Sequence, residues 1–300
     1  MKLYFVLRAQ RGYNYVDDVD RSKLRDDYNN NKEVHNEFYN YWNRLFKKSY
    51  NQVRKELKDL VLQTVHDAKF DKVYLNLDDF RDDYGSILAD TDPEEKFVLF
   101  MDDDDFIKPN VCDVIKNNYI EGFDGITWNY LRYHGLYNCF YSPNTMEYTT
   151  RGIETEVNKL FVKNDLRYSP WPYIQSNHCI IKLPSVKKPS HGSWWPEYQQ
   201  LVPVNHSCIH LHLFEHNSNR KTYNIAQCLS LHNTTPASYS FYDNDYKTGG
   251  RHKEIFDDPR NFYNVMKSFV EVEPHGTVQF VDDEFKVLLD KQRKIFEGCL

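Results

Sequence analysis

Long apolar runs are missing from this chain of 300 residues. The purely apolar runs are short, as in Phe97–Met101, whereas a membrane-spanning helix needs roughly 20 predominantly apolar residues in succession. The sequence therefore predicts no transmembrane segment. The opening stretch, MKLYFVLRAQR, also lacks a small-residue cleavage site, so we expect a first strand there and not a signal peptide. We accordingly expect a cytoplasmic protein.

Paired cysteines and an excess of positive charge are missing as well. The six cysteines form no C-x-x-C pair, which disfavours a zinc site or a redox dithiol, and we expect reduced thiols packed mostly in the core. The formal net charge of -6 argues against a nucleic-acid backbone as the main partner. Because no internal repeat or clear linker is visible, we favour a single domain.

The first part of the chain alternates between the patterns of strands and helices. Apolar residues in KLYFVLRA, KVYLNL and FVLFM predict three strands, and the spacing of apolar residues over 33–68 predicts one long or two consecutive amphipathic helices. This order is typical of a doubly wound parallel sheet, in which ligands bind outside the carboxyl ends of the strands. The expected strands end in charged residues, namely Arg8, Asp78 and Asp102.

The second part of the chain is less regular. We expect short strands in GFDGITWNYLRY and HCIIKL, a late strand in QCLSLHNTTPASYSFY that runs into a loop, and a packing helix in EFKVLLDKQRKIFEG. Aromatic and proline-rich segments lie between these elements, such as RYSPWPYIQSN and KKPSHGSWWPEYQQ. Such segments resemble binding loops more than core.

Four consecutive aspartates follow the third expected strand, in FVLFMDDDDFIKPN. Like charges repel one another, and ionised carboxylates lose solvation beside a buried strand. We therefore infer that a positive group lies there. A solvated turn or a helix cap is the alternative interpretation of such a run. The following FIKPN predicts a turn that leads into a helix.

The aspartate run carries a resemblance to a known family. A hydrophobic strand that runs into Asp-x-Asp-Asp, followed by an apolar residue and a proline, resembles the DxD region of GT-A fold glycosyltransferases. It is most similar to the form in family 2-like enzymes and rhamnosyltransferase-like proteins of microbes and viruses. The resemblance covers residues 1–240, and only the aspartate strand is specific.

The resemblance implies a fold and a division of the chain. The fold is α/β, with a GT-A-like, Rossmann-type, mostly parallel sheet flanked by helices in a single domain. The glycosyltransferase domain would span residues 1–245, with a nucleotide-binding part over 1–110 and an acceptor part over 111–245. Residues 246–300 would add a C-terminal loop and a packing helix.

The resemblance also implies a reaction, in which a hexosyl or pentosyl group passes from a nucleoside-diphosphate sugar to a hydroxyl of a glycan or glycoconjugate. A Mn²⁺ or Mg²⁺ ion that bridges the two phosphates would stabilise the leaving group, and hard oxygen ligands suit these ions. A downstream histidine commonly completes the metal site in this family. The implied ligands are Asp102, Asp104, Asp105 and His232.

Further residues are candidates for the donor nucleotide. Asp102 and Asp104, one residue apart at a strand end, are expected to converge on the donor and the metal, with Asp103 pointing away. Arg8 would hold phosphate through charge-assisted hydrogen bonds, although simple surface charge also explains it. The remaining nucleotide candidates are Asp78, Asp79, Asp102 and Asp103, of which the first two also fit an ordinary strand-ending turn.

The chain departs from the family pattern in the acceptor region, where it lacks a recognisable Glu-Asp pair, and its first helix is long. An inverting transfer needs a base that removes the proton of the acceptor hydroxyl. Glu197, among the aromatics of HGSWWPEYQ, and His206 are the candidates. A retaining transfer requires no such base, and the sequence leaves both stereochemical outcomes open.

Two other classes of function stay open. The first is a cupin-like metalloenzyme, because alternate histidines on a strand share a face, although flanking glycines and a second motif are missing. The second is a non-catalytic carbohydrate-binding protein that combines aromatic platforms, from 23 Tyr and 19 Phe, with an acidic calcium site. The residues of the first alternative are His206, His210, His212, Glu215 and His216.

Overall fold

The chain forms two compact units. The computed structural model describes residues 1–8, 39–123, 125–134, 139–141, 179–183, 222–238, 258–272, 275–276 and 283–300. The first unit holds the described residues of Met1–Ala9, Gln63–Leu131 and Tyr141–His232, and the second holds those of Gln10–Leu62, Arg132–Phe140 and Asn233–Leu300. The predicted boundary between residues 245 and 246 lies outside the described residues.

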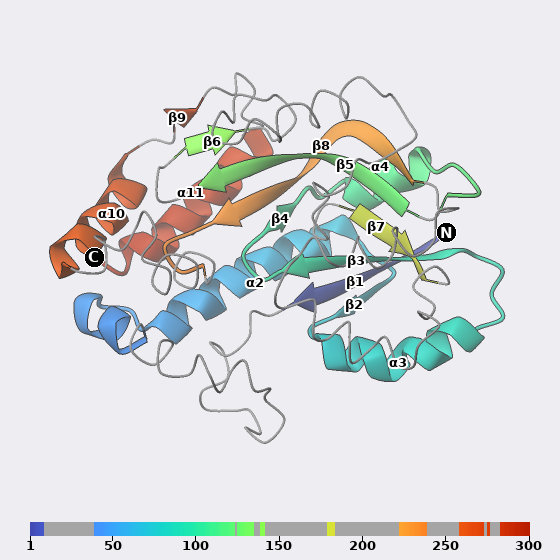
Figure 1. Ribbon diagram of the computed structural model, residues 1–300, viewed down its shortest axis with the longest axis horizontal. Coiled ribbons are helices and arrows are strands. Elements are labelled where there is room, and N and C mark those ends of the chain that lie inside the picture. The colour runs from blue at the N-terminus through green and yellow to red at the C-terminus, as the bar shows by residue number, and fades with distance from the viewer. Residues whose placement is uncertain are drawn as a thin grey trace. The chain divides into compact units, whose positions relative to one another are not determined.

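Strands and helices alternate from β1 to β3, and several strands then follow one another in the second part of the described chain, as Figure 1 shows. The strands are β1 Lys2–Arg8, β2 Lys72–Tyr74, β3 Lys96–Asp102, β4 Phe106–Ile107, β5 Gly125–His134, β6 Cys139–Tyr141, β7 Cys179–Lys182, β8 Thr222–Thr234 and β9 His275–Gly276. The helices are α2 Tyr50–Ala68, α3 Leu77–Ala89, α4 Val111–Asn117, α10 Pro259–Glu271 and α11 Asp283–Glu297, with a further short helix at 39–45. Among the described helices, none has both the length and the apolarity needed to cross a bilayer.

The expected α/β class is confirmed, with a sheet that is only partly parallel. The strand order of the main sheet includes β2-β1-β3-β7-β5, and β8 lies between β4 and β5 in a second, three-stranded arrangement. β1 pairs in parallel with both β2 and β3, so their carboxyl ends meet at one edge. β7 then runs antiparallel to β3 and to β5. Among the strands β2-β1-β3-β7-β5, the parallel pairs are therefore the two that β1 makes, and β6 and β9 form a further short parallel pair.

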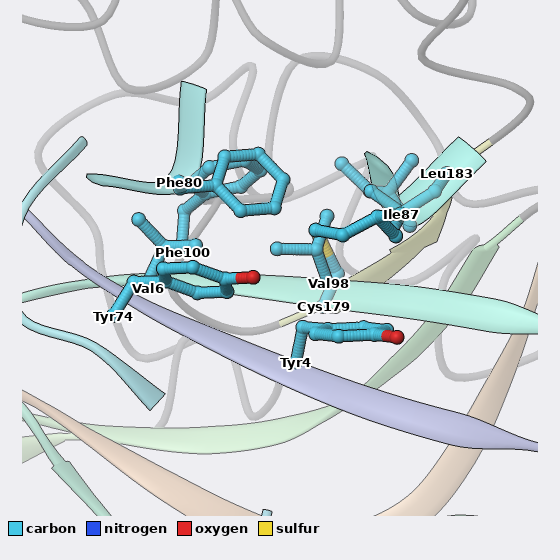
Figure 2. Close-up of a cluster of buried hydrophobic side chains, with 10 residues drawn as sticks. Tyr4, Val6, Tyr74, Phe80, Ile87, Val98, Phe100, Cys179 and Leu183 are labelled. Carbon is cyan, nitrogen blue, oxygen red and sulfur yellow. The ribbon is translucent and has the colours of Figure 1, made fainter. Parts of the chain in front are cut away.

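One face of this sheet packs against α3. Alternate residues of a strand point to the same face, and Figure 2 shows Tyr4 and Val6 of β1 together with Phe100 of β3 on the side of the helix. The ring of Phe80 from α3 lies 5.6 Å from that of Phe100 and 5.2 Å from that of Tyr74. The buried members of this cluster are Tyr4, Val6, Tyr74, Phe80, Ile87, Val98, Phe100, Cys179, Ile181 and Leu183.

The other face of the sheet is covered too. Phe5 is fully buried, and its ring lies 5.3 Å from that of Phe70, which follows α2. Phe97 is also fully buried, with its ring 5.9 Å from that of Tyr119 after α4. Strands buried on both faces need continuous apolar runs, which explains why FVLFM shows no alternation with polar residues.

The stretch between β2 and β3 holds a helix that the sequence reading missed. β2 ends at Tyr74, and Asn76 caps α3, because its Oδ1 accepts a hydrogen bond from Asp79 N at 2.8 Å while its Nδ2 donates to Asp79 Oδ2 at 2.8 Å. This reciprocal pair resembles a capping box. The expectation that Asp78 and Asp79 end a strand is wrong, since both lie in the first turn of α3, where negative charge is favourable.

The second unit contains most of α2, the expected helix α11 and one helix that we did not expect. The region 33–68 forms two consecutive helices over its described residues, 39–45 and α2, and Ser49 Oγ accepts a hydrogen bond from Gln52 N at the start of α2. α11 confirms the predicted packing helix. α10 was missed, although Asp258 accepts a hydrogen bond from Arg260 N and Pro259 occupies the first turn, which are ordinary start signals for a helix.

Truncating Phe80 should destabilise the first unit strongly. Phe80→Ala removes a fully buried ring between α3 and the sheet, so we expect a loss of about 3 to 5 kcal/mol in the free energy of unfolding. Urea unfolding followed by circular dichroism measures this loss. Leu75→Ala in the same unit is the control, since Leu75 is 48% exposed and should change stability by less than about 0.5 kcal/mol. Equal losses for both variants would contradict the packing described here.

Candidate functional site

The four aspartates form a buried turn at the carboxyl end of β3. Asp102 is the last residue of the strand, the next two residues lie in the turn, and Asp105 precedes β4. The turn is closed by a backbone hydrogen bond from Asp105 N to Asp102 O, at 3.4 Å. The exposed fractions are 6%, 0%, 3% and 1% for Asp102, Asp103, Asp104 and Asp105. The interpretation of a solvated turn therefore does not apply to this run.

The aspartates follow a turn and not the extended strand geometry that the sequence predicted for them. Strand alternation predicted that Asp103 points away from Asp102 and Asp104, but β3 ends at Asp102. The two residues after it follow a turn, in which the period of two does not hold. Asp103 lies in the turn and is fully buried, so its expected placement on a strand is wrong and strand alternation does not set its direction.

Arg8 and Asp102 end neighbouring strands. In the parallel ladder between β1 and β3, Arg8 pairs with Asp102 at the last position. The backbone of Arg8 therefore lies beside the start of the aspartate turn, at the edge where the sequence predicted both residues. The carboxyl ends of parallel strands are the usual place for ligands in open α/β sheets.

β8 brings His232 to the aspartate turn. β4 pairs antiparallel with β8, with Phe106 opposite Leu231 and Ile107 opposite Ser230. Extending this register by one residue sets Asp105 opposite His232, and Nδ1 of His232 lies 3.3 Å from Oδ1 of Asp105. His232 therefore lies beside Asp105, and the role of the two residues as metal ligands stays a prediction.

The His232–Asp105 pair has the chemistry of a partial cation site. Adjacent ligands of an octahedral cation at about 2.1 Å stand about 3 Å apart, which is close to the observed separation of 3.3 Å. A proton on Nδ1 would instead make the imidazole a hydrogen-bond donor to the carboxylate. The side chain of His232 is 15% exposed, whereas that of Asp105 is 1% exposed. The separation is therefore compatible with a divalent cation, which stays a prediction.

The full set of four metal ligands is not preformed. Over the described part of the chain, no three His, Cys, Asp or Glu side chains gather closely enough to hold a metal ion. Mg²⁺ in enzymes commonly uses one or two carboxylates and takes its other ligands from substrate phosphates and water. One pair of protein ligands is therefore compatible with a cation that arrives with a diphosphate. The assignment of Asp102 and Asp104 as ligands stays a prediction.

The remaining candidates have separate positions or lie outside the described residues. Asp79 is exposed and serves as a helix-capping partner of Asn76, and Asp78 lies in the same helical turn. Their contact with a nucleotide stays a prediction. The candidate bases and the alternative histidine cluster lie outside the described residues, namely Glu197, His206, His210, His212, Glu215 and His216.

Two residues near the site were missed by the sequence reading. Trp128 of β5 donates a hydrogen bond from Nε1 to Ser230 Oγ of β8 at 2.8 Å, and both side chains are buried. Ser230 stands two residues before His232, in the alternation CLSLH. That alternation was the signal for Ser230, because residues two apart on a strand share a face. Trp128 gave no comparable signal.

Comparison with models of known families gives no match, and a search of curated proteins gives none either. A function is therefore inferred from the geometry of the aspartate turn and of His232. Of the residues predicted for the metal, Asp105 and His232 lie 3.3 Å apart, from Oδ1 to Nδ1.

The Asp105–His232 contact predicts a measurable coupling between the two side chains. In a double-mutant cycle with Asp105→Asn and His232→Gln, the losses in unfolding free energy should deviate from additivity by about 0.5 to 3 kcal/mol. Urea unfolding of the wild type, both single variants and the double variant gives this energy.

Asp71→Asn is the matched control for this cycle. Asp71 lies in the same unit but at the amino end of the parallel strands, where its Oδ2 accepts a hydrogen bond from Leu3 N at 2.7 Å. Its effect should add to that of His232→Gln to within about 0.5 kcal/mol. Coupling of similar size for Asp71 and Asp105 would show that the cycle reports global destabilisation and not this contact.

Proposed function

We propose that this chain is a metal-dependent glycosyltransferase, which moves a sugar from a nucleoside-diphosphate donor to a hydroxyl of a glycan or glycoconjugate. The observation that carries the proposal is the pairing of His232 with Asp105 at the end of a buried strand. The two residues come from separate strands, and both were singled out as ligands of one cation.

The location of the pair supports a ligand site. The aspartate turn lies at the carboxyl ends of β1 and β3, where Arg8 is in register with Asp102. Open α/β sheets bind nucleotides at such edges. Arg8 is the candidate for the donor phosphates, because its guanidinium forms charge-assisted hydrogen bonds with phosphate oxygens.

The charge of the turn supports a cation as part of that site. Ionised carboxyl groups in one buried turn raise one another's free energy, since like charges disfavour the ionised form. A bound Mn²⁺ or Mg²⁺ ion would relieve this repulsion, and it would supply Lewis-acid stabilisation of the departing diphosphate. The imidazole of His232 favours Mn²⁺ over Mg²⁺, because nitrogen is the softer ligand.

In this proposal, different residues of the chain bind the metal, bind the donor and remove the proton of the acceptor. Asp105 and His232 hold the metal-bearing end of the donor, and Asp102 and Asp104 are the further candidates for the metal and the ribose. Removal of the proton from the acceptor hydroxyl, if transfer is inverting, falls to Glu197 or His206. A retaining enzyme would use neither residue as a base.

Nucleotide binding should depend on the cation. We expect UDP or GDP to bind measurably with Mn²⁺ and to lose most of its affinity in EDTA, because the carboxylates alone repel the phosphates. Isothermal titration calorimetry with each nucleotide, with Mn²⁺ or with EDTA, measures this difference. Tight binding that ignores EDTA, or no binding of any nucleoside diphosphate with Mn²⁺, would count against the proposal.

His232→Ala should show whether His232 acts as a metal ligand or has only a structural role. Loss of the Asp105 contact should lower the melting temperature of the variant in EDTA, at a cost of about 1 to 3 kcal/mol for the partner left without a hydrogen bond. For a metal ligand, the variant should in addition show a much smaller rise in melting temperature than the wild type when Mn²⁺ and nucleotide are added, because a ligand of the native state stabilises it by mass action. Melting curves in both buffers distinguish the two roles, and a full wild-type shift in the variant would remove His232 from the site.

A further inference from the structure

The face of β8 that carries His232 also carries Ser230, whose side chain forms a buried hydrogen bond with β5. Ser230 and His232 are two residues apart and share a face of β8. On β4, Ile107 stands opposite Ser230, and Asp105 contacts His232. On the other side of β8, Trp128 of β5 donates its indole N–H to Ser230 Oγ at 2.8 Å. The candidate cation pair and this hydrogen bond therefore occupy consecutive positions on one face.

β8 also pairs with β5, but its backbone pairing with β4, which carries Asp105 to His232, is short. β4 contributes Phe106 and Ile107, and Lys108 N adds one more backbone hydrogen bond to Leu229 O at 2.9 Å. A shift of one residue in strand register would turn His232 to the opposite face. A ladder of this length resists such a shift only weakly, so a specific side-chain contact has a large effect on register.

We propose that Trp128 and Ser230 are positioning residues for the cation site. Their hydrogen bond fixes β8 against β5 in the register that sets His232 beside Asp105. Trp128 is 1% exposed and Ser230 is fully buried, so water does not compete for this bond as it would at the surface. The proposal rests on the proposed function, because it concerns the same metal and nucleotide site.

Two substitutions break the hydrogen bond between Trp128 and Ser230, one at the donor and one at the acceptor. Trp128→Phe removes the indole N–H and keeps an aromatic ring, and Ser230→Ala removes the acceptor with little change in volume. Each should weaken Mn²⁺-dependent binding of UDP or GDP, whichever the wild type binds, by about tenfold, as second-shell changes around metals do. The double variant should bind no more weakly than the weaker single variant, because both changes break the same bond.

Trp42→Phe is the matched control. Trp42 lies in the second unit, is fully buried, and donates from Nε1 to Lys48 O at 3.0 Å. Its substitution removes a buried indole hydrogen bond of the same kind, so it should lower the melting temperature comparably but leave Mn²⁺-dependent binding unchanged. If Trp128→Phe also binds as the wild type does, the positioning role is overturned. Ser230→Ala decides the question in the same way if Trp128→Phe does not fold.

A measurement without ligand separates this inference from the proposed function. The coupling between Asp105→Asn and His232→Gln is measured in the wild type and again with Trp128→Phe, using the unfolding cycle described above. We expect most of the coupling to disappear in the Trp128→Phe background. Coupling of wild-type size in that background overturns the inference. If the wild type binds no nucleotide with Mn²⁺, the proposed function fails, and this cycle alone decides whether Trp128 positions His232.

Discussion

The burial of four adjacent carboxyl groups at the end of β3 is the constraint on which the candidate site depends. Each is at most 6% exposed, and the cost of moving an ionised carboxylate out of water is several kcal/mol unless other groups compensate it. The apolar run of β3 is covered on both faces and keeps the turn in place. The sheet therefore supplies the stability that holds this concentration of acidic groups together.

The change from parallel to antiparallel pairing places a second strand, β8, beside the candidate site. β1 and β3 run in parallel, so their last residues, Arg8 and Asp102, share one edge. After the turn the chain pairs antiparallel with β8, which returns from a distant part of the sequence. An entirely parallel sheet would present only strand ends at this edge. The antiparallel partner adds the imidazole of His232, beside Asp105.

The sequence allowed much of the fold to be predicted, because apolar runs and helical spacing report burial directly. The three N-terminal strands, α2 and α11 follow that rule, whereas His232 was singled out by the family resemblance and not by hydrophobicity. The missed elements depend on local capping, as with Asn76 at α3, whose acidic first turn looks like the end of a strand. The orientation of Asp103 depends on where β3 stops, and hydrophobicity does not mark that residue because burial continues through the aspartates. The contact between Trp128 and Ser230 depends on tertiary pairing between distant strands.

The edge strand of the main sheet affects whether copies of the chain can pair through their sheet edges. β2 is the edge of the order β2-β1-β3 and contains only three residues. It begins with Lys72, whose ammonium group forms an ion pair with Asp83 of α3, and α3 follows two residues after the strand. Short edge strands that carry lysine are poor templates for a strand from another molecule. This edge therefore discourages the edge-to-edge aggregation to which a sheet of apolar strands is otherwise prone.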